Sequence, residues 1–272
     1  MNWITEHKLP FGEFIEGIVD FLVDNGAGFF DAISESLSSL IYGLTDLLLW
    51  VPPGVMVALF AVAAYFRHRS WGLAVFTLIS FLLIWNLGYW EDTMATLSLV
   101  LYATLLCVVI GIPLGIYAAH HQWLYKGLQP VLDLMQTIPP FVYLIPTLTL
   151  FGLGVVPGVI STVIFAIAAP VRLTYLGISQ VPTELVEAGK AFGCTNRQLL
   201  FRIELPAAMS SIGAGITQCI MLSLSMVVIA ALVGADGLGV PVVRALNTVD
   251  IGKGFEAGLA IVLLAIWMDR FF

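Results

Sequence analysis

The sequence predicts an all-α integral membrane protein with about seven transmembrane helices, and two observations support this. The 272-residue chain is 60% hydrophobic and 11% charged, with a mean hydropathy of +0.99, whereas a soluble domain is about 25% charged. Five long runs contain no Asp, Glu, Lys or Arg: 47–66, 71–90, 93–119, 134–171 and 207–234. A spanning helix needs about 20 apolar residues, so the run 134–171 is long enough for two.

The expected spans follow from these runs and are 47–66, 71–89, 93–118, 134–153, 156–176, 209–233 and 254–271. The second is the weakest, because Asn86 and Gly88 interrupt its end. Proline and glycine interrupt several others, at Pro113, Gly115, Pro139, Pro140, Pro146, Gly152, Gly154, Pro157 and Pro170. Broken helices are tolerated at membrane depth where protein or a water-filled cavity satisfies the freed backbone groups. The pattern therefore favours a transport pathway, although any single proline is as often a kink for helix packing.

Polar residues within the spans are assigned mainly structural roles. Ser161, Thr162, Ser223 and Ser225 are expected to pack or to donate interhelical hydrogen bonds. The cysteines and histidines show no spacing typical of a metal site, and we expect none.

Residues 1–46 form an acidic arm ahead of the first two spans, which occupy 47–91. Eight acidic residues stand against Lys8 before residue 50 and account for much of the net charge of −7. Apolar residues recur at helical spacing, at Phe14, Ile18, Phe21 and Leu22 and again at Ile33, Leu37, Leu40 and Ile41. This predicts amphipathic helix lying on a membrane or on the protein's own helices. A partly ordered, solvated tail is the alternative.

The basic residues predict the orientation, because cytoplasmic loops are enriched in Lys and Arg. With the N-terminus outside, eight of the eleven fall on the cytoplasmic side: Arg67, Arg69, Lys126, Arg172, Lys190, Arg197, Arg202 and Arg270. The other side receives Lys8, Arg244 and Lys253. We therefore expect the N-terminus outside and the segment 183–206 in the cytoplasm.

The segment 184–206, ELVEAGKAFGCTNRQLLFRIELP, concentrates charge between two apolar regions, and the 28 residues after it carry none. Pro182–Thr183 is expected to begin a short helix that Gly193 ends in the left-handed conformation. Thr195 begins a second helix, and Gln198 completes a capping box. Pro206 is expected to break or kink that helix as it enters the membrane. One face of such a short surface helix is available to a partner.

The segment is not a nucleotide-binding loop. A Walker A loop needs Gly, four residues, and then Gly-Lys-Ser/Thr. Gly189–Lys190 is preceded at that spacing by Glu184 and followed by Ala191. The other Gly-Lys pair, Gly252–Lys253, fails in the same way. We therefore expect no ATPase activity and no cofactor in this chain.

The stretch EAGKAFGCTNRQLLFRIELP resembles the EAA loop of ABC importer permeases. Its matching residues are Glu187, Ala188, Gly189, Gly193, Ile203, Leu205 and Pro206. The departure is Gly189, which stands where the motif has a third alanine. Four further stretches, 132–154, 170–178, 217–239 and 245–266, resemble the permeases of quaternary-amine importers, the glycine betaine/proline betaine/choline class. The resemblance covers about 92–271.

The resemblance implies a type I ABC importer with its transmembrane domain at 92–271. It implies two permease copies, cytoplasmic ATPases that bind ATP and Mg, and an external substrate-binding protein. The EAA loop would be the helix that couples the permease to the ATPase. The protein would sit in the bacterial inner membrane, in contact with the lipid bilayer, and we expect no nucleic-acid partner.

Four residues are candidates for the solute pathway: Asp133, Gln136, Phe141 and Tyr143. Asp133 is expected chiefly to cap its helix or to pair with a basic residue near the cytoplasmic end of a span. Aromatic faces attract cations, but Phe141 and Tyr143 are more often packing residues. Other functions stay open, including an importer of another small solute such as an amino acid. An ion-coupled secondary transporter would need carboxylates in mid-membrane, which the central runs lack, and no catalytic constellation indicates an enzyme.

Overall fold

The computed structural model describes residues 11–272, and these are almost entirely helical. Lys8 of the charge count lies outside this range. The chain begins with α2 (Phe11–Trp50), α3 (Pro53–His68), α4 (Trp71–Asn86) and α5 (Trp90–His120). It continues with α6 (Gln122–Thr137), α7 (Pro140–Phe151), α8 (Val155–Ala166) and α9 (Ala168–Ser179). The last helices are α10 (Thr183–Ala191), α11 (Asn196–Leu199), a π-helical turn at Leu200–Glu204, α12 (Leu205–Ala231), α13 (Gly239–Thr248) and α14 (Ile251–Phe271).

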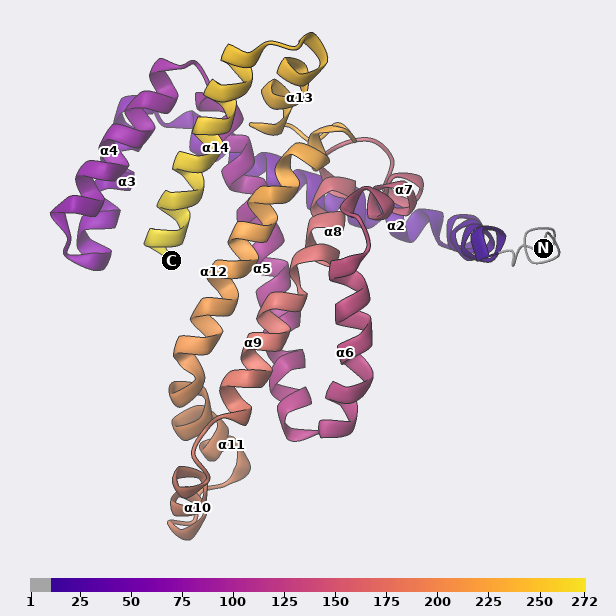
Figure 1. Cartoon of the computed structure of the whole chain (residues 1–272), viewed down its shortest axis with the longest axis vertical. Coiled ribbons are helices and arrows are strands. Elements are labelled where there is room, and N and C mark those ends of the chain that lie inside the picture. The colour runs from indigo at the N-terminus through magenta and orange to yellow at the C-terminus, as the bar shows by residue number, and fades with distance from the viewer. Residues whose placement is uncertain (1–10) are drawn as a thin grey trace, which may run out of the picture.

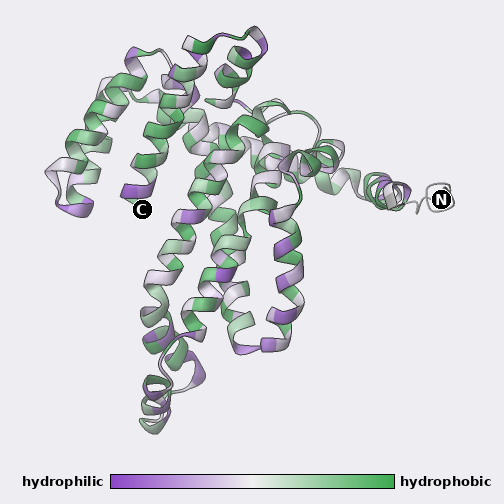
Figure 2. Cartoon of the chain, in the orientation of Figure 1, coloured by the Kyte–Doolittle hydropathy of each residue, from purple (hydrophilic) through white to green (hydrophobic). Residues whose placement is uncertain are grey.

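The membrane-spanning prediction is confirmed in outline. Four helical stretches are long and apolar enough to cross a membrane, namely Trp90–His120, Val155–Ser179, Asn196–Ala231 and Ile251–Phe271. Two bent pairs raise the count to six if each pair is one span, and α4 is a shorter apolar helix. Figure 2 shows hydrophobic colour over most of these helices and hydrophilic colour gathered at several turns.

Two of the expected spans, 134–153 and 47–66, are not single helices, so this part of the prediction is wrong. The region 134–153 breaks at Ile138–Pro139, and α6 and α7 meet at 96°. Two successive prolines explain the break, since a residue before proline avoids helical dihedrals and proline cannot donate a backbone hydrogen bond. The region 47–66 is likewise divided, because the helix of the arm continues to Trp50 and meets α3 at 101° beyond Val51–Pro52.

The arm is helical from Phe11 onward and lies partly against the rest of the protein. Its later half packs on α5, α7 and α8. The rings of Phe30 and Phe151 meet edge to face at 5.4 Å, and the Tyr42 hydroxyl donates to Asp236 at 3.3 Å. The expected helix is therefore present, and it lies on the protein's own helices rather than as a solvated tail. Its earlier turns leave Phe14 and Phe21 exposed.

The centre of the fold is a packed group of α5, α8, α9 and α12 (Figure 1). Small residues let these helices approach closely, as is usual between membrane helices. A Cβ on Gly115 of α5 would lie 2.7 Å from the Thr174 Cβ of α9. Among the four expected hydroxyl donors, Ser161 bonds across helices, to Thr147 at 2.8 Å. Thr162, Ser223 and Ser225 instead donate to carbonyls four residues earlier in their own helices.

The segment 183–206 lies at one extreme of the molecule. Figure 1 shows α10 and α11 beyond the ends of the other helices, at the opposite end from α13. The long helix α12 and the adjoining α9 carry the segment there, which leaves it free for contact with a partner.

Candidate functional site: the segment 183–206

The first part of the segment is the helix α10, whose beginning was predicted correctly. It starts at Thr183 after Pro182, and Glu184 lies in its first turn, where a negative charge is favourable. Glu187 and Ala188 are exposed, whereas Gly189 is buried. The helix therefore presents the first two residues of the EAA motif outward and turns the third toward the protein.

Gly189 is the residue that lets α10 pack against the second half of the segment. A Cβ at this position would lie 2.5 Å from the Ile203 Cδ1 and 2.9 Å from the Leu199 Cδ1. Leu199 is buried and Ile203 is partly buried. The motif residues Gly189 and Ile203, fourteen positions apart in the sequence, thus form one contact.

The turn at Gly193 has the predicted left-handed conformation, with φ at +78°. The Cys194 N–H donates to the Gly189 carbonyl at 3.0 Å, and the Gly193 N–H donates to the Lys190 carbonyl at 2.9 Å. These bonds satisfy carbonyls that the end of a helix leaves free. Backbone conformation, rather than lack of space, favours glycine here, because a Cβ would have no neighbour within 4 Å.

The second helix begins with the predicted capping box. The Gln198 N–H donates to the Thr195 Oγ1 at 3.4 Å, and the Thr195 N–H donates to the Gln198 Oε1 at 2.9 Å. The two bonds fix the direction in which the chain leaves the glycine turn. The segment is therefore a helix, a left-handed turn and a second helix, as the sequence indicated.

Pro206 was expected to break or kink the second helix, and the structure shows that the helix is not broken there. Helix runs from Asn196 to Ala231 as one stretch, and a π-helical turn at Leu200–Glu204 precedes α12. The Leu205 N–H donates to the Leu200 carbonyl, five residues back. The wider turn accommodates the backbone N–H that Pro206 lacks. Single π-helical turns within α-helices are frequent at functional sites. Leu205 packs in a cluster with Ile178, Ala208 and Ile212, and Pro206 is exposed.

A side-chain contact between His120 and Glu204 joins this turn to the body of the protein. The His120 Nε2 lies 3.0 Å from the Glu204 Oε2, and the Glu204 side chain is 9% exposed. His120 is the last residue of α5, so the contact links the end of a central helix to the segment. The sequence does not reveal this contact, because a pairing of residues 84 positions apart leaves no local signal.

Comparison with known families decides what this segment belongs to. Residues 111–272, more than half of the chain, match the family described as "Binding-protein-dependent transport system inner membrane component".

The chain belongs to this family of permeases.

Three relatives extend the match over nearly the whole chain. The "Glycine betaine transport system permease protein OpuAB" of Bacillus subtilis is 46% identical over 97% of this chain and 93% of its own. The "Glycine betaine/carnitine transport permease protein GbuB" of Listeria monocytogenes is 47% identical over 96% and 94%. The "Glycine betaine/proline betaine transport system permease protein ProW" of Escherichia coli is 43% identical over 97% and 75%. The stated resemblance to quaternary-amine importer permeases is confirmed.

A solved structure confirms the type of fold. The MetNI methionine ABC transporter in an inward-facing conformation matches with a TM-score of 0.57, over 63% of this chain and 86% of the MetNI chain. The identity is 20%, so the likeness concerns the fold alone. The permease is therefore an all-α membrane protein of the type I importer fold.

The four pathway candidates lie on either side of the break between α6 and α7. The Asp133 Oδ1 accepts a hydrogen bond of 2.6 Å from the Arg172 Nη2 of α9, which is the expected pairing with a basic residue. The Tyr143 hydroxyl donates to the Met135 carbonyl at 2.6 Å and so ties the two arms of the bend together. Gln136 is partly buried and Phe141 is 54% exposed. The contacts of Asp133 and Tyr143 stabilise the bend, and a role in the pathway stays a prediction for all four.

Sequence reasoning missed the most exposed apolar side chain of the segment. Phe192, next to Gly193, is 89% exposed, and Leu185 on α10 is 48% exposed. Exposed apolar side chains gathered on a projecting element are typical of an interaction surface. The available signal was an aromatic residue placed at the glycine turn of a charged segment.

Proposed function

We propose that the chain is the membrane permease of an ATP-driven importer for a quaternary-amine solute such as glycine betaine, proline betaine or choline. The solute class is proposed from the names of three relatives, all of which include glycine betaine. Those relatives give no support to an amino acid as the solute, and the family argues against an ion-coupled transporter.

The segment 183–206, called the coupling segment from here on, is the proposed contact with a cytoplasmic ATPase. Its geometry is the observation that supports this role. The helix α10 projects from the molecule (Figure 1) and packs closely against Ile203 through Gly189. Phe192 and Leu185 offer apolar anchors, and the acidic Glu184 and Glu187 lie on the same exposed helix. A rigid element with an exposed aromatic residue is suited to a groove on a partner, where aromatic anchors supply much of the binding energy. ATP and Mg would then be bound by the partner and not by this chain.

The N-terminus is proposed to face the outside, with the coupling segment in the cytoplasm. The imbalance of eight basic residues against three supports this orientation. The arrangement of helices agrees with it, because the end of α14 and the α3–α4 turn point toward the same side as α10 (Figure 1). The helix α13, which carries Arg244, lies at the opposite end.

An external substrate-binding protein is the proposed partner at that opposite end. A cavity of about 640 Å³ opens there, lined by polar residues that include Asp92, Asp236, Arg244 and Lys253. Charges of both signs on a recessed surface favour a partner with complementary charges.

Two copies of the permease are proposed to enclose the solute pathway. The bent helices α6 and α7 leave apolar side chains exposed, among them Val131, Leu134, Phe141 and Ile145. A second copy could cover part of this face, and the mass of the purified assembly tests for it. A complex with a single permease copy for each pair of ATPases would contradict this proposal.

The test of the function is reconstitution in vesicles with the ATPase and the binding protein. We expect uptake of labelled glycine betaine that requires ATP and all three components. Uptake driven by an ion gradient without ATP would refute the importer class. ATP-driven uptake of an amino acid, without uptake of any quaternary amine, would refute only the solute class.

A further inference from the structure

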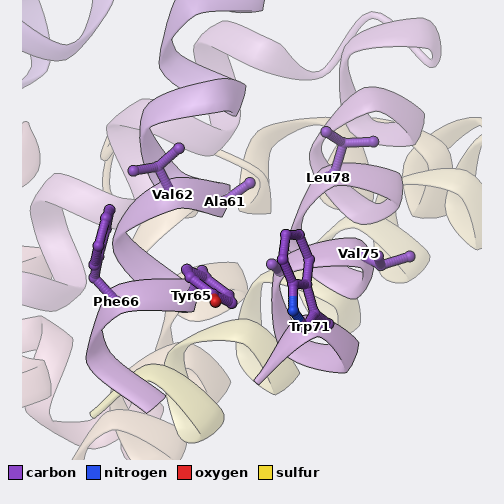
Figure 3. Close-up of a pocket in the computed structure, with 8 residues that line it drawn as sticks. Ala61, Val62, Tyr65, Phe66, Trp71, Val75 and Leu78 are labelled. Carbon is purple, nitrogen blue, oxygen red and sulfur yellow. The ribbon is translucent and has the colours of Figure 1, made fainter. Parts of the chain in front are cut away.

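An apolar groove of about 280 Å³ lies between α3 and α4 (Figure 3). Its lining contains no charged residue and consists of Ala61, Val62, Tyr65, Phe66, Trp71, Ala74, Val75 and Leu78. Figure 3 shows Tyr65 and Trp71 facing one another across the gap, and their ring centroids are 4.5 Å apart. Phe66 is 74% exposed and Trp71 is 71% exposed. The groove is therefore open and has two broad aromatic side chains at one end.

That end of the groove adjoins a basic turn. Arg67 and Arg69 follow the lining residues of α3 directly and are both exposed. In the part of the chain that the structure describes, neither forms an ion pair. Figure 2 shows the turn as a hydrophilic patch below a hydrophobic hairpin. Two exposed cationic residues thus directly follow the residues with which α3 lines the apolar groove.

The basic turn is held in place by its own hydrogen bonds. The Arg69 N–H donates to the Tyr65 carbonyl and ends α3, with Arg69 in the left-handed conformation at φ +49°. The Ser70 Oγ accepts from the Leu73 N–H and begins α4. The His68 Nε2 lies 3.1 Å from the Phe271 carbonyl and ties the turn to α14. The positions of the two arginine backbones are therefore defined before any ligand binds.

We propose that this groove and turn bind one anionic phospholipid, which would belong to the cytoplasmic leaflet in the orientation proposed above. An acyl chain would lie between α3 and α4, and the phosphate would lie at Arg67 and Arg69. Burial of an acyl chain removes apolar surface from water or detergent. Guanidinium groups match phosphate geometry through paired hydrogen bonds. Basic residues beside apolar membrane helices on the cytoplasmic side are a known setting for lipid headgroups.

The charges nearby favour a lipid over a second copy of the chain. Two arginines on a protein interface would need carboxylates to neutralise them. On the proposed cytoplasmic side, Asp133, Glu204 and Asp269 each already lie within 4.0 Å of a basic or histidine side chain. The exposed Glu184 and Glu187 belong to the segment that is proposed to contact the ATPase. A phospholipid supplies the missing negative charge together with the apolar chain that the groove accommodates. Its binding would brace a hairpin whose other contacts are chiefly with α14 and α5.

The test is native mass spectrometry of the full-length chain in detergent, titrated with phosphatidylglycerol, phosphatidylcholine or inorganic phosphate. We expect phosphatidylglycerol to be retained preferentially and phosphate alone not to be retained. Arg67→Gln and Arg69→Gln should each weaken phosphatidylglycerol binding about fivefold, the equivalent of about 1 kcal/mol per basic residue. Lys126→Gln removes a charge from the same side of the membrane and should leave the preference unchanged.

The groove itself is tested with a matched pair of substitutions on α4. Val75→Phe fills the groove and should weaken binding of both lipids, whereas Ile79→Phe should not. Val75 and Ile79 are 51% and 58% exposed, and only Val75 lines the groove. A brominated acyl chain should also quench the fluorescence of Trp71, seen as a component of the total tryptophan quenching that is lost in Trp71→Phe. Equal retention of both lipids, or a preference unchanged in both arginine variants, would overturn the proposal.

Dimer formation that Val75→Phe abolishes while lipid retention stays unchanged would assign the groove to a second copy and would also overturn it. None of these outcomes bears on the solute or on the ATPase, so the proposed function is tested separately.

Discussion

Gly189 and Ile203 pack so closely that a Cβ on the glycine would lie 2.5 Å from the Cδ1 of the isoleucine. Both residues belong to the motif by which the segment resembles an EAA loop, and their contact joins the two halves of that segment. Glycine therefore replaces the third alanine of the motif here, and its lack of a Cβ lets α10 lie closer to the following helix than alanine would.

Gly189→Ala is expected to transport at near the wild-type rate, whereas Gly189→Leu is expected to uncouple hydrolysis from transport. The alanine methyl meets only the mobile ends of Ile203 and Leu199, and alanine favours helix by about 1 kcal/mol over glycine. Leucine would push α10 away from its support. Uptake and ATP hydrolysis in vesicles are the measurement, and normal coupling in Gly189→Leu would show that the packing does not matter.

Phe192→Ala is expected to weaken association with the ATPase about tenfold or more. An exposed aromatic anchor that becomes buried in a partner is typically worth more than 1 kcal/mol, and about 1.4 kcal/mol corresponds to tenfold. The affinity of the purified ATPase for permease in nanodiscs is the measurement. Trp123→Ala is the control, because Trp123 is 68% exposed but lies outside the segment. Equal losses of affinity in the two variants would show that Phe192 has no special role in binding the ATPase.

His120→Ala is expected to lower the melting temperature of the purified permease, since it leaves the buried Glu204 carboxylate without its partner. An unsatisfied buried polar group costs about 1–3 kcal/mol, and more when it is charged. Glu204→Gln keeps a side chain that can bond to His120 and should have a small effect. The double variant should be more stable than His120→Ala alone. Losses that simply add would show that the pair contributes little.

The orientation can be tested with thiol labelling and only one engineered cysteine. Cys107 and Cys219 are buried and Cys194 is partly exposed, so Cys194 is the native reporter for the coupling segment. A cysteine at the exposed Asn25 should react with an impermeant reagent added outside intact cells, and Cys194 should react only after lysis. The reverse pattern would place the N-terminus in the cytoplasm.

Local chemistry explains why the helix–turn–helix of the segment 183–206 could be predicted, whereas its π-helical turn and its exposed Phe192 were not. The beginning of α10, the left-handed Gly193 and the capping box of Thr195 and Gln198 each depend on residues within a few positions of one another. The bend between α6 and α7 was not predicted, although Pro139 and Pro140 were recognised as interruptions. Composition alone does not say whether successive prolines kink a span or divide it.

Contacts distant in the sequence were beyond prediction for a different reason. The pair of His120 with Glu204 and the contact of Tyr42 with Asp236 depend on how whole helices pack. The pairing of Asp133 with a basic residue was predicted, because a carboxylate near the end of a span is stabilised by a nearby cation. Its partner Arg172 was identified only by the structure.

If the helix–turn–helix of residues 183–206 couples the permease to an ATPase, a change in the backbone conformation of Gly193 should separate hydrolysis from transport. Valine at a left-handed position costs about 1–2 kcal/mol, whereas asparagine tolerates that conformation. A Cβ at this position would have no neighbour within 4 Å, so the two variants are expected to differ mainly in backbone strain. In vesicles with the ATPase and binding protein, Gly193→Val should hydrolyse ATP without matching uptake of glycine betaine, and Gly193→Asn should transport normally. Normal transport by Gly193→Val, in protein shown to be inserted and assembled, would show that this segment does not couple hydrolysis to transport.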